Sequence, residues 1–200
     1  MVVLPVDKVK KLYYKNGYSA REIGEFLGVS TEVVYDFMQK YNLPRRNLYE
    51  QNRILFAKKP LSFKVKKNLT QKEQKLKIAA IMLYWAEGAK RSQAVDFTNS
   101  EPRMVKFFLK FLREICRVDE QRLRILLYCY ANQDIGKIKK FWSKLTKIPL
   151  SQFIKPYIRQ DYSLKCKREM KYGLIHIRYS DKKLWRLILE WIDRYLERNL

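Results

Sequence analysis

Glu87 is the residue of this 200-residue chain whose type and position most clearly suggest chemistry. It ends an apolar run, and the S/T-x-x-E spacing of Thr70 and Glu73 predicts that this run begins as a capped helix. A carboxylate at a helix C-terminus is disfavoured by the macrodipole, so stability alone does not explain it. The ordinary alternative is an amphipathic helix that ends at Gly88. The helical spacing is carried by Leu76, Ala79, Ala80, Leu83 and Ala86.

Other residues that commonly do chemistry are sparse. The three cysteines, Cys116, Cys129 and Cys166, are widely spaced and lack a C-x-x-C pair, which argues against a disulfide framework or a zinc site. The single histidine, His176, lies in the alternating run GLIHIRYS, where an ordinary strand residue is the favoured interpretation. A histidine-based catalytic triad is therefore not expected.

The charge balance predicts a polyanionic partner. The chain carries 43 Lys and Arg against 20 Asp and Glu, a net charge of +23. Nucleic acid is the leading partner, because each neutralised phosphate releases condensed counterions. An anionic membrane surface is the competing partner, but no apolar run reaches the length of a spanning helix, and the N-terminus lacks the apolar region of a signal peptide. We expect an intracellular, cytoplasmic protein that associates with the nucleoid when bound.

Positive charge is densest in residues 47–70, which hold six basic residues and one acid. The segment AKKPLSFKVKKNLT contains Pro60 and has no helical apolar period, which predicts an extended, mobile basic linker. This divides the chain into domains at 1–46 and 71–200. Three linker lysines are candidate DNA contacts: Lys64, Lys66 and Lys67.

Residues 6–44 carry the start and stop signals of three short helices. Ser19 and Glu22 have capping-box spacing, and Gly28 ends that second helix. Ser30 offers another N-cap, and Pro44 stops the third helix, whose predicted buried stripe is Val33, Val34, Phe37 and Met38.

This pattern resembles the helix-turn-helix of bacterial and archaeal regulators, resolvases and transposases, whose second motif helix enters the major groove. The resemblance implies that the outward side chains of residues 31–39 face base edges, and that the two arginines after the helix reach the backbone or a minor groove. A protein-contact module is the alternative, since Glu32 and Asp36 would repel phosphate. The candidate contacts are Thr31, Glu32, Tyr35, Gln39, Arg45 and Arg46.

The run Ala80 to Gly88, AIMLYWAEG, resembles the LAGLIDADG motif of homing endonucleases. In that family the final acid binds a divalent metal for phosphodiester cleavage, and its position falls on Glu87. Met82 stands where the family has a small residue, and Trp85 stands where it has the first acid. The resemblance implies that Glu87 is a catalytic Mg²⁺ ligand and that Lys90 tunes the attacking water.

The resemblance extends over roughly residues 71–198. AVDFTNS, EPRMVKFFLKFLREICRV and RLRILLYCYA indicate strand, helix and strand, and the tail adds a helix near 134–146, the strand YGLIHIRYS and a last helix. Compared with the order of elements in that family, this chain lacks a strand after Gly88 and has an additional helix near 134–146. The expected fold class is α+β: a trihelical helix-turn-helix domain, then a LAGLIDADG-like domain whose curved antiparallel sheet is packed by helices.

In this fold the sheet sits over the major groove, so basic residues of its strands and loops are the expected contacts. About half could instead be merely solvated. The candidates are Lys90, Arg91, Arg122, Arg124, Lys155, Arg159, Lys165, Lys167, Arg168 and Arg178.

Only one such motif is present, and cleavage in the family needs two paired motif helices. We therefore expect a homodimer through the helix around Ala79–Gly88, on a pseudo-palindromic site. The favoured function is sequence-specific binding of double-stranded DNA. A Mg²⁺-dependent homing-type endonuclease that cleaves through paired Glu87 is the first alternative. An RNA-binding, maturase-like protein is the second.

Overall fold

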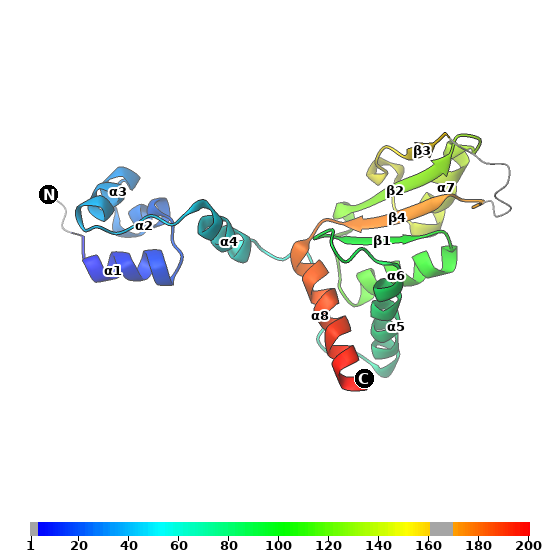
Figure 1. The fold of residues 1–200 in the computed structure, drawn as a ribbon, viewed down its shortest axis with the longest axis horizontal. Helices are drawn as coiled ribbons and strands as arrows, with labels where there is room; N and C mark the ends of the chain where they lie inside the picture. Colours follow the sequence, from blue (N-terminus) through cyan, green and yellow to red (C-terminus); the bar gives the residue numbers. More distant parts are fainter. Residues whose placement is uncertain (1–3, 161–169) are drawn as a thin grey trace. The chain divides into compact units, whose positions relative to one another are not determined.

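The computed structural model describes residues 4–160 and 170–200 and has an α+β fold (Figure 1). The chain forms two compact units, Met1–Pro60 and Leu61–Leu200. Within the described ranges, no helix is both long and apolar enough to span a membrane.

The N-terminal unit is entirely helical. It comprises α1 (Val6–Lys10), the π-helical turn η1 (Lys11–Lys15), α2 (Ala20–Leu27), α3 (Thr31–Lys40) and α4 (Leu48–Lys58). The predicted capping box joins Ser19 and Glu22, and Gly28 ends α2 in the left-handed conformation at φ 71°. Ser30 caps α3 as expected. One core prediction was wrong: Val33 is 39% exposed, because α3 turns Val34 and Met38 toward the other helices.

Residues 47–70, expected to be a linker, divide between the two units. Asn47 and Glu50 form a capping box that starts α4. After Pro60 the chain is extended but anchored: Lys64 N and Lys66 N donate to the carbonyls of Cys116 and Ile115. Burial of Phe63 in the second core supplies the physical reason for this anchoring.

The C-terminal unit alternates helices and strands. Its helices are α5 (Gln71–Glu87), α6 (Pro102–Glu114), α7 (Ile135–Thr146) and α8 (Lys182–Asn199), with short 3₁₀ turns η2 (Glu120–Arg122) and η3 (Leu150–Gln152). The strands are β1 (Val95–Asn99), β2 (Leu123–Tyr130), β3 (Tyr157–Arg159) and β4 (Leu174–Tyr179).

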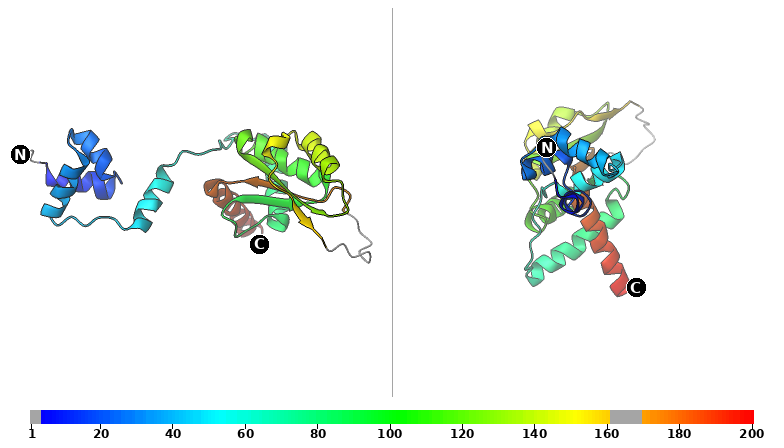
Figure 2. Two further views of the ribbon diagram at one scale, coloured as in Figure 1. Left: turned by 90° about the horizontal axis from the view of Figure 1, so that it is seen from above. Right: turned by 90° about the vertical axis from the view of Figure 1, so that its left-hand side faces the viewer.

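The four strands form one sheet in the order β1-β4-β2-β3 (Figure 1), and the views in Figure 2 show its twist. β4 pairs antiparallel with both β1 and β2, whereas β3 pairs parallel with β2. The sheet is therefore mixed, and the expectation of a wholly antiparallel sheet was wrong at this edge. The physical reason is that α7 lies between β2 and β3 in the chain, so β3 runs in the same direction as β2.

All four helices of this unit contribute to one core on one face of the sheet. In Figure 1, α5, α6 and α8 lie together on one side of β1. Ile175, Ile177 and Tyr179 of β4 point into this core. Because strand residues alternate between faces, the intervening side chains form the opposite face of the sheet.

Helix α5 buries Leu76 and Ala80 of the predicted stripe and adds Ile81 and Tyr84. Ala80 and Tyr84 are fully buried, and Tyr84 stacks on Phe108 with ring centroids 5.6 Å apart. Ala79 and Ala86, which were expected inside, are exposed. The Tyr84 ring is the cause, because its large apolar area is best buried against α6 and its hydroxyl reaches the Ala89 carbonyl at 3.0 Å.

Gly88 allows this packing, and replacing it should destabilise the unit. A Cβ there would lie 2.4 Å from the Tyr84 ring. We expect Gly88→Ala to lower the free energy of unfolding by about 1–3 kcal/mol, as overpacking does. Gly136→Ala is the matched control, because its Cβ would meet only the Asp134 carboxylate at 3.3 Å and alanine favours the helix. Urea unfolding measures both, and an unchanged Gly88→Ala midpoint would contradict this account.

Candidate nucleic-acid interface

The face of the sheet opposite the helices carries a mixed basic and aromatic surface, here named the open face. Strand register aligns its side chains in rows: Asp96, Arg178 and Arg124 form one row across β1, β4 and β2. Cross-strand partners share a face of the sheet, so register and alternation define the set. It comprises Asp96, Thr98, Arg124, Leu126, Tyr128, Tyr130, Tyr157, Arg159, Leu174, His176 and Arg178.

Asp96 is the only acid in the four strands, and on β4 Arg178 pairs with its charge while His176 lies within hydrogen-bond distance. Its carboxylate accepts from Arg178 Nε at 2.8 Å and lies 3.0 Å from His176 Nδ1. Thr98 Oγ1 lies 2.9 Å from the same His176 nitrogen. The open face is therefore free of uncompensated negative charge along its strands.

Burial and partners act in opposite directions on Asp96. Burial raises its pKa, but the hydrogen bond from His176 and the charges of His176 and Arg178 outweigh burial, so the pKa lies below its ordinary value. A carboxyl group whose pKa is lower in the folded state stabilises the fold above its unfolded pKa, and this stabilisation is lost as the pH falls.

We therefore expect Asp96 to contribute to acid unfolding. As the pH falls below about 5, the free energy of unfolding of the wild type should decline more steeply than that of Asp96→Asn, because only the wild type must protonate this group. Urea titrations of both proteins at several pH values measure the difference. Parallel pH profiles would show that the Asp96 cluster does not stabilise the fold.

Aromatic rings continue the open face toward β3. Tyr128 lies between Tyr157 and His176, with ring centroids 5.0 Å and 4.6 Å away. Tyr157 is 57% exposed. This pair was not predicted from the sequence. The signal was present in LRILLYCY, where Leu127 and Cys129 are buried and Tyr128 therefore faces the other way.

The predicted strand and loop contacts fall into three groups. Arg124, Arg159 and Arg178 lie on the open face, with Arg124 and Arg159 exposed. Arg122 precedes β2 and donates to the Ser180 carbonyl at 2.8 Å, and Arg124 Nη1 likewise donates to the Gln121 and Leu123 carbonyls. Lys155 is exposed just before β3. Lys165, Lys167 and Arg168 lie outside the described residues.

The predicted DNA-contacting lysines within residues 61–70 belong to the C-terminal unit, at its start. Lys64 and Lys67 are exposed. Lys66 forms an ion pair with Glu73 at 2.5 Å, which completes the start of α5. This ion pair gives Lys66 a structural role.

In the N-terminal unit, α3 presents Glu32, Tyr35 and Gln39 as exposed residues, with Thr31 half-buried. The Arg45 guanidinium lies 4.0 Å from the centroid of the Tyr35 ring, so these two form one surface with α3. Arg46 instead covers the Tyr13 ring at 4.1 Å and donates to the Tyr18 carbonyl. The structure therefore places Arg45 with the exposed α3 residues and Arg46 within the framework of the unit.

Glu87 is the exposed last residue of α5, followed by the exposed pair Lys90 and Arg91 in the turn before β1. No hydrogen bond or ion pair joins the Glu87 carboxylate to another residue of the described ranges. Across these same ranges, no three His, Cys, Asp or Glu side chains come together as a metal site. Among the described residues, this helix end thus offers a single carboxylate, that of Glu87.

Comparisons with known proteins add no relative. The chain matches no family model, no curated protein and no solved structure.

Proposed function

We propose that this protein binds double-stranded DNA in a sequence-specific manner as a homodimer. The observation that carries the proposal is the open face, on which Arg124, Arg159 and Arg178 accompany the exposed Tyr157 ring and Asp96 is paired with Arg178. A net charge of +23 supports a polyanionic ligand. The resemblance to LAGLIDADG proteins, in which the sheet sits over the major groove, points to the same surface.

The two units would have different tasks on the duplex. Arginines of the open face suit both phosphate contacts and bidentate readout of guanine edges. On α3, Tyr35 and Gln39 are exposed side chains that can contact base edges, while Arg45 beside Tyr35 supplies a cation. Two units joined by a short extended segment would read adjacent parts of one site.

The dimer proposal rests on an exposed apolar stripe of α5. Ile78 is 40% exposed and Trp85 is 49% exposed, and the smaller Ala79 and Ala86 are exposed beside them. Their positions, together with half-buried Met82, follow i, i+1, i+4, i+7 and i+8, which places them on one side of the helix. A second copy of the same stripe is its natural complement, because a twofold axis makes such a surface self-complementary.

Duplexes selected from a random pool test the function. We expect log K to fall with log[salt] more steeply than a slope of about −3, because several phosphates must be neutralised. Arg124→Glu should weaken binding about tenfold or more, whereas Arg198→Glu, an exposed arginine near the end of α8, should change it less than about threefold. Equal effects of the two variants would remove the open face from the interface. Tighter binding to structured RNA than to any selected duplex would favour the maturase-like alternative.

Cleavage is a second candidate function, favoured by the free carboxylate of Glu87. Mg²⁺ prefers carboxylate oxygens, so Glu87 fits as a ligand, although one protomer offers only one acid. Pairing of two α5 helices would bring two Glu87 side chains together. A bound Mg²⁺ would supply activation of water and stabilisation of the leaving oxygen, and the exposed Lys90 would lie in the following turn.

A further inference from the structure

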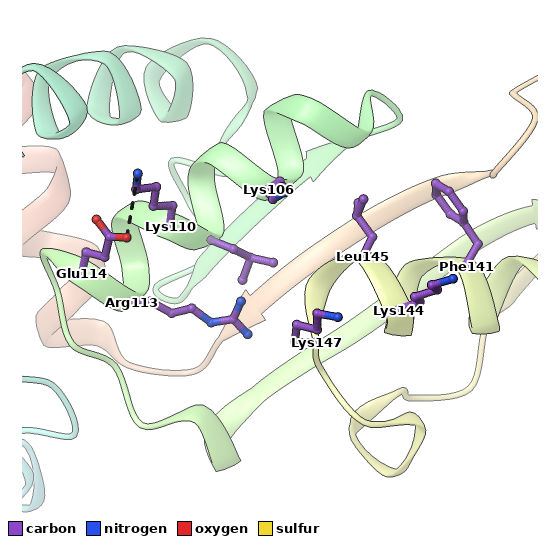
Figure 3. Close-up of a pocket in the computed structure, with 9 residues that line it drawn as sticks. Lys106, Lys110, Arg113, Glu114, Phe141, Lys144, Leu145 and Lys147 are labelled. Atoms are coloured by element: carbon purple, nitrogen blue, oxygen red, sulfur yellow. Dashed lines mark ion pairs between the residues drawn. The ribbon is translucent and has the colours of Figure 1, made fainter.

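A groove separates α6 and α7 within the helical layer of the C-terminal unit (Figure 3). Its volume is about 760 Å³. Both helices contribute to the core beneath the sheet, so the groove shares no residue with the open face. Its lining consists of Lys106, Leu109, Lys110, Arg113, Glu114, Phe141, Lys144, Leu145 and Lys147.

Helical periodicity explains why these side chains converge. On α6, lining residues recur at i, i+3, i+4 and i+7 from Lys106, and on α7 they recur at i, i+3 and i+4 from Phe141. Each helix therefore turns one stripe toward the groove. Leu109, Phe141 and Leu145 give the groove an apolar part, and the charged side chains surround it.

The charged side chains are almost all cationic. Glu114 is the single acid of the lining and lies 3.9 Å from Lys110, and Arg113 binds Glu120 through two bonds of 2.7 Å and 2.8 Å. Lys106, Lys144 and Lys147 have no ion pair or hydrogen bond to any residue in 4–160 or 170–200.

Lys147 is the lining residue that directly follows α7. It ends α7 in the left-handed conformation, with φ of 61°. Glycine is the favoured residue at such a helix end, and a lysine there costs about 1 kcal/mol of backbone strain. A cation there also interacts favourably with the helix C-terminus, and Lys147 is an exposed cation of the groove lining.

We propose that the α6–α7 groove binds an acidic peptide segment of a partner protein, with apolar side chains seated on Phe141 and Leu145 above the buried Leu109. Acidic groups of the peptide pair with Lys106, Lys144 and Lys147. Nucleic acid fits this groove less well, because phosphates would leave the apolar part in contact with water. One face of the Phe141 ring is already stacked on Tyr172 at 3.6 Å, so it offers no free platform between two bases.

The test uses the full chain and a labelled amphipathic peptide of about 14 residues, with leucines at i, i+3, i+4 and i+7 and glutamates beside them. Fluorescence anisotropy should show saturable binding that weakens with salt. Lys144→Glu should weaken it about tenfold, whereas Lys140→Glu, an exposed lysine of the same helix outside the groove, should change it less than about twofold. Both variants make the same charge change on α7. Comparing them therefore separates peptide binding in the groove from an effect of the net charge of the protein.

Two altered peptides and two competitors complete the test. Replacing the leucines by serines, or the glutamates by glutamines, should each abolish binding. A selected duplex should bind at the same time as the peptide, and polyphosphate should compete weakly. The proposal is overturned if the serine peptide or polyphosphate binds as tightly as the parent peptide, if Lys140→Glu matches Lys144→Glu, if duplex DNA displaces the peptide from the groove, or if the parent peptide fails to bind.

Discussion

Trp85→Glu is expected to convert the protein to a monomer and to shorten its DNA footprint to one half-site. Trp85 is the largest member of the exposed α5 stripe. In a symmetric dimer, the substitution would bring two carboxylates together near the twofold axis. It would also remove two aromatic anchors. Such central anchors contribute about 2–4 kcal/mol each to association, so the loss of two should raise the dimer dissociation constant by about a thousandfold or more.

Met104→Glu is the matched control for this change. Met104 is an apolar residue of α6 with 41% exposure, so it receives the same charge in a similar setting outside the stripe. Sedimentation of both variants measures the association, and circular dichroism verifies that each remains folded. If wild type is monomeric at high concentration, or if Trp85→Glu still dimerises, the α5 stripe is not the dimer interface.

Local signals in the sequence predicted the ends of several helices correctly. The capping boxes at Ser19 and Thr70 formed because their partners lie three residues away, within the same turn. The same signal at Asn47 and Glu50 was overlooked. The α4 helix has exposed Leu48, Tyr49 and Leu55, so its apolar pattern does not stand out from a linker.

Non-local features could not be predicted in the same way. The parallel pairing of β3 depends on where α7 returns the chain, and a strand of three residues carries no clear alternation. The burial of Tyr84 depends on Phe108 and on Gly88, which are brought together only by the fold.

The candidate site shows the same division between local and non-local information. Strand alternation correctly predicts that Arg178 points away from the core, but its bond to Asp96 joins residues 82 positions apart. The arginines of the open face could therefore be predicted, whereas the neutralisation of Asp96 and the pairing of Tyr128 with Tyr157 required the register of the sheet.

Glu87→Gln should abolish any Mg²⁺-dependent nicking of the selected duplex while leaving its affinity equal or improved. In paired α5 helices the two Glu87 carboxylates would repel each other, and this repulsion would be relieved either by Mg²⁺ or by the neutral amide. Glutamine keeps the size of the side chain and loses the charge that the metal needs.

Glu114→Gln is the matched control for Glu87→Gln, because Glu114 is also the exposed last residue of its helix. Nicking by the wild type and both variants is compared in Mg²⁺ and in EDTA, together with affinity in EDTA. A solvated helix-end acid with no other task would change affinity by only a few tenths of a kcal/mol and would leave nicking intact. Nicking by Glu87→Gln at the wild-type rate would thus exclude Glu87 as a metal ligand. Tight binding by all three proteins without nicking would exclude the endonuclease and leave a DNA-binding protein whose α5 serves for pairing alone.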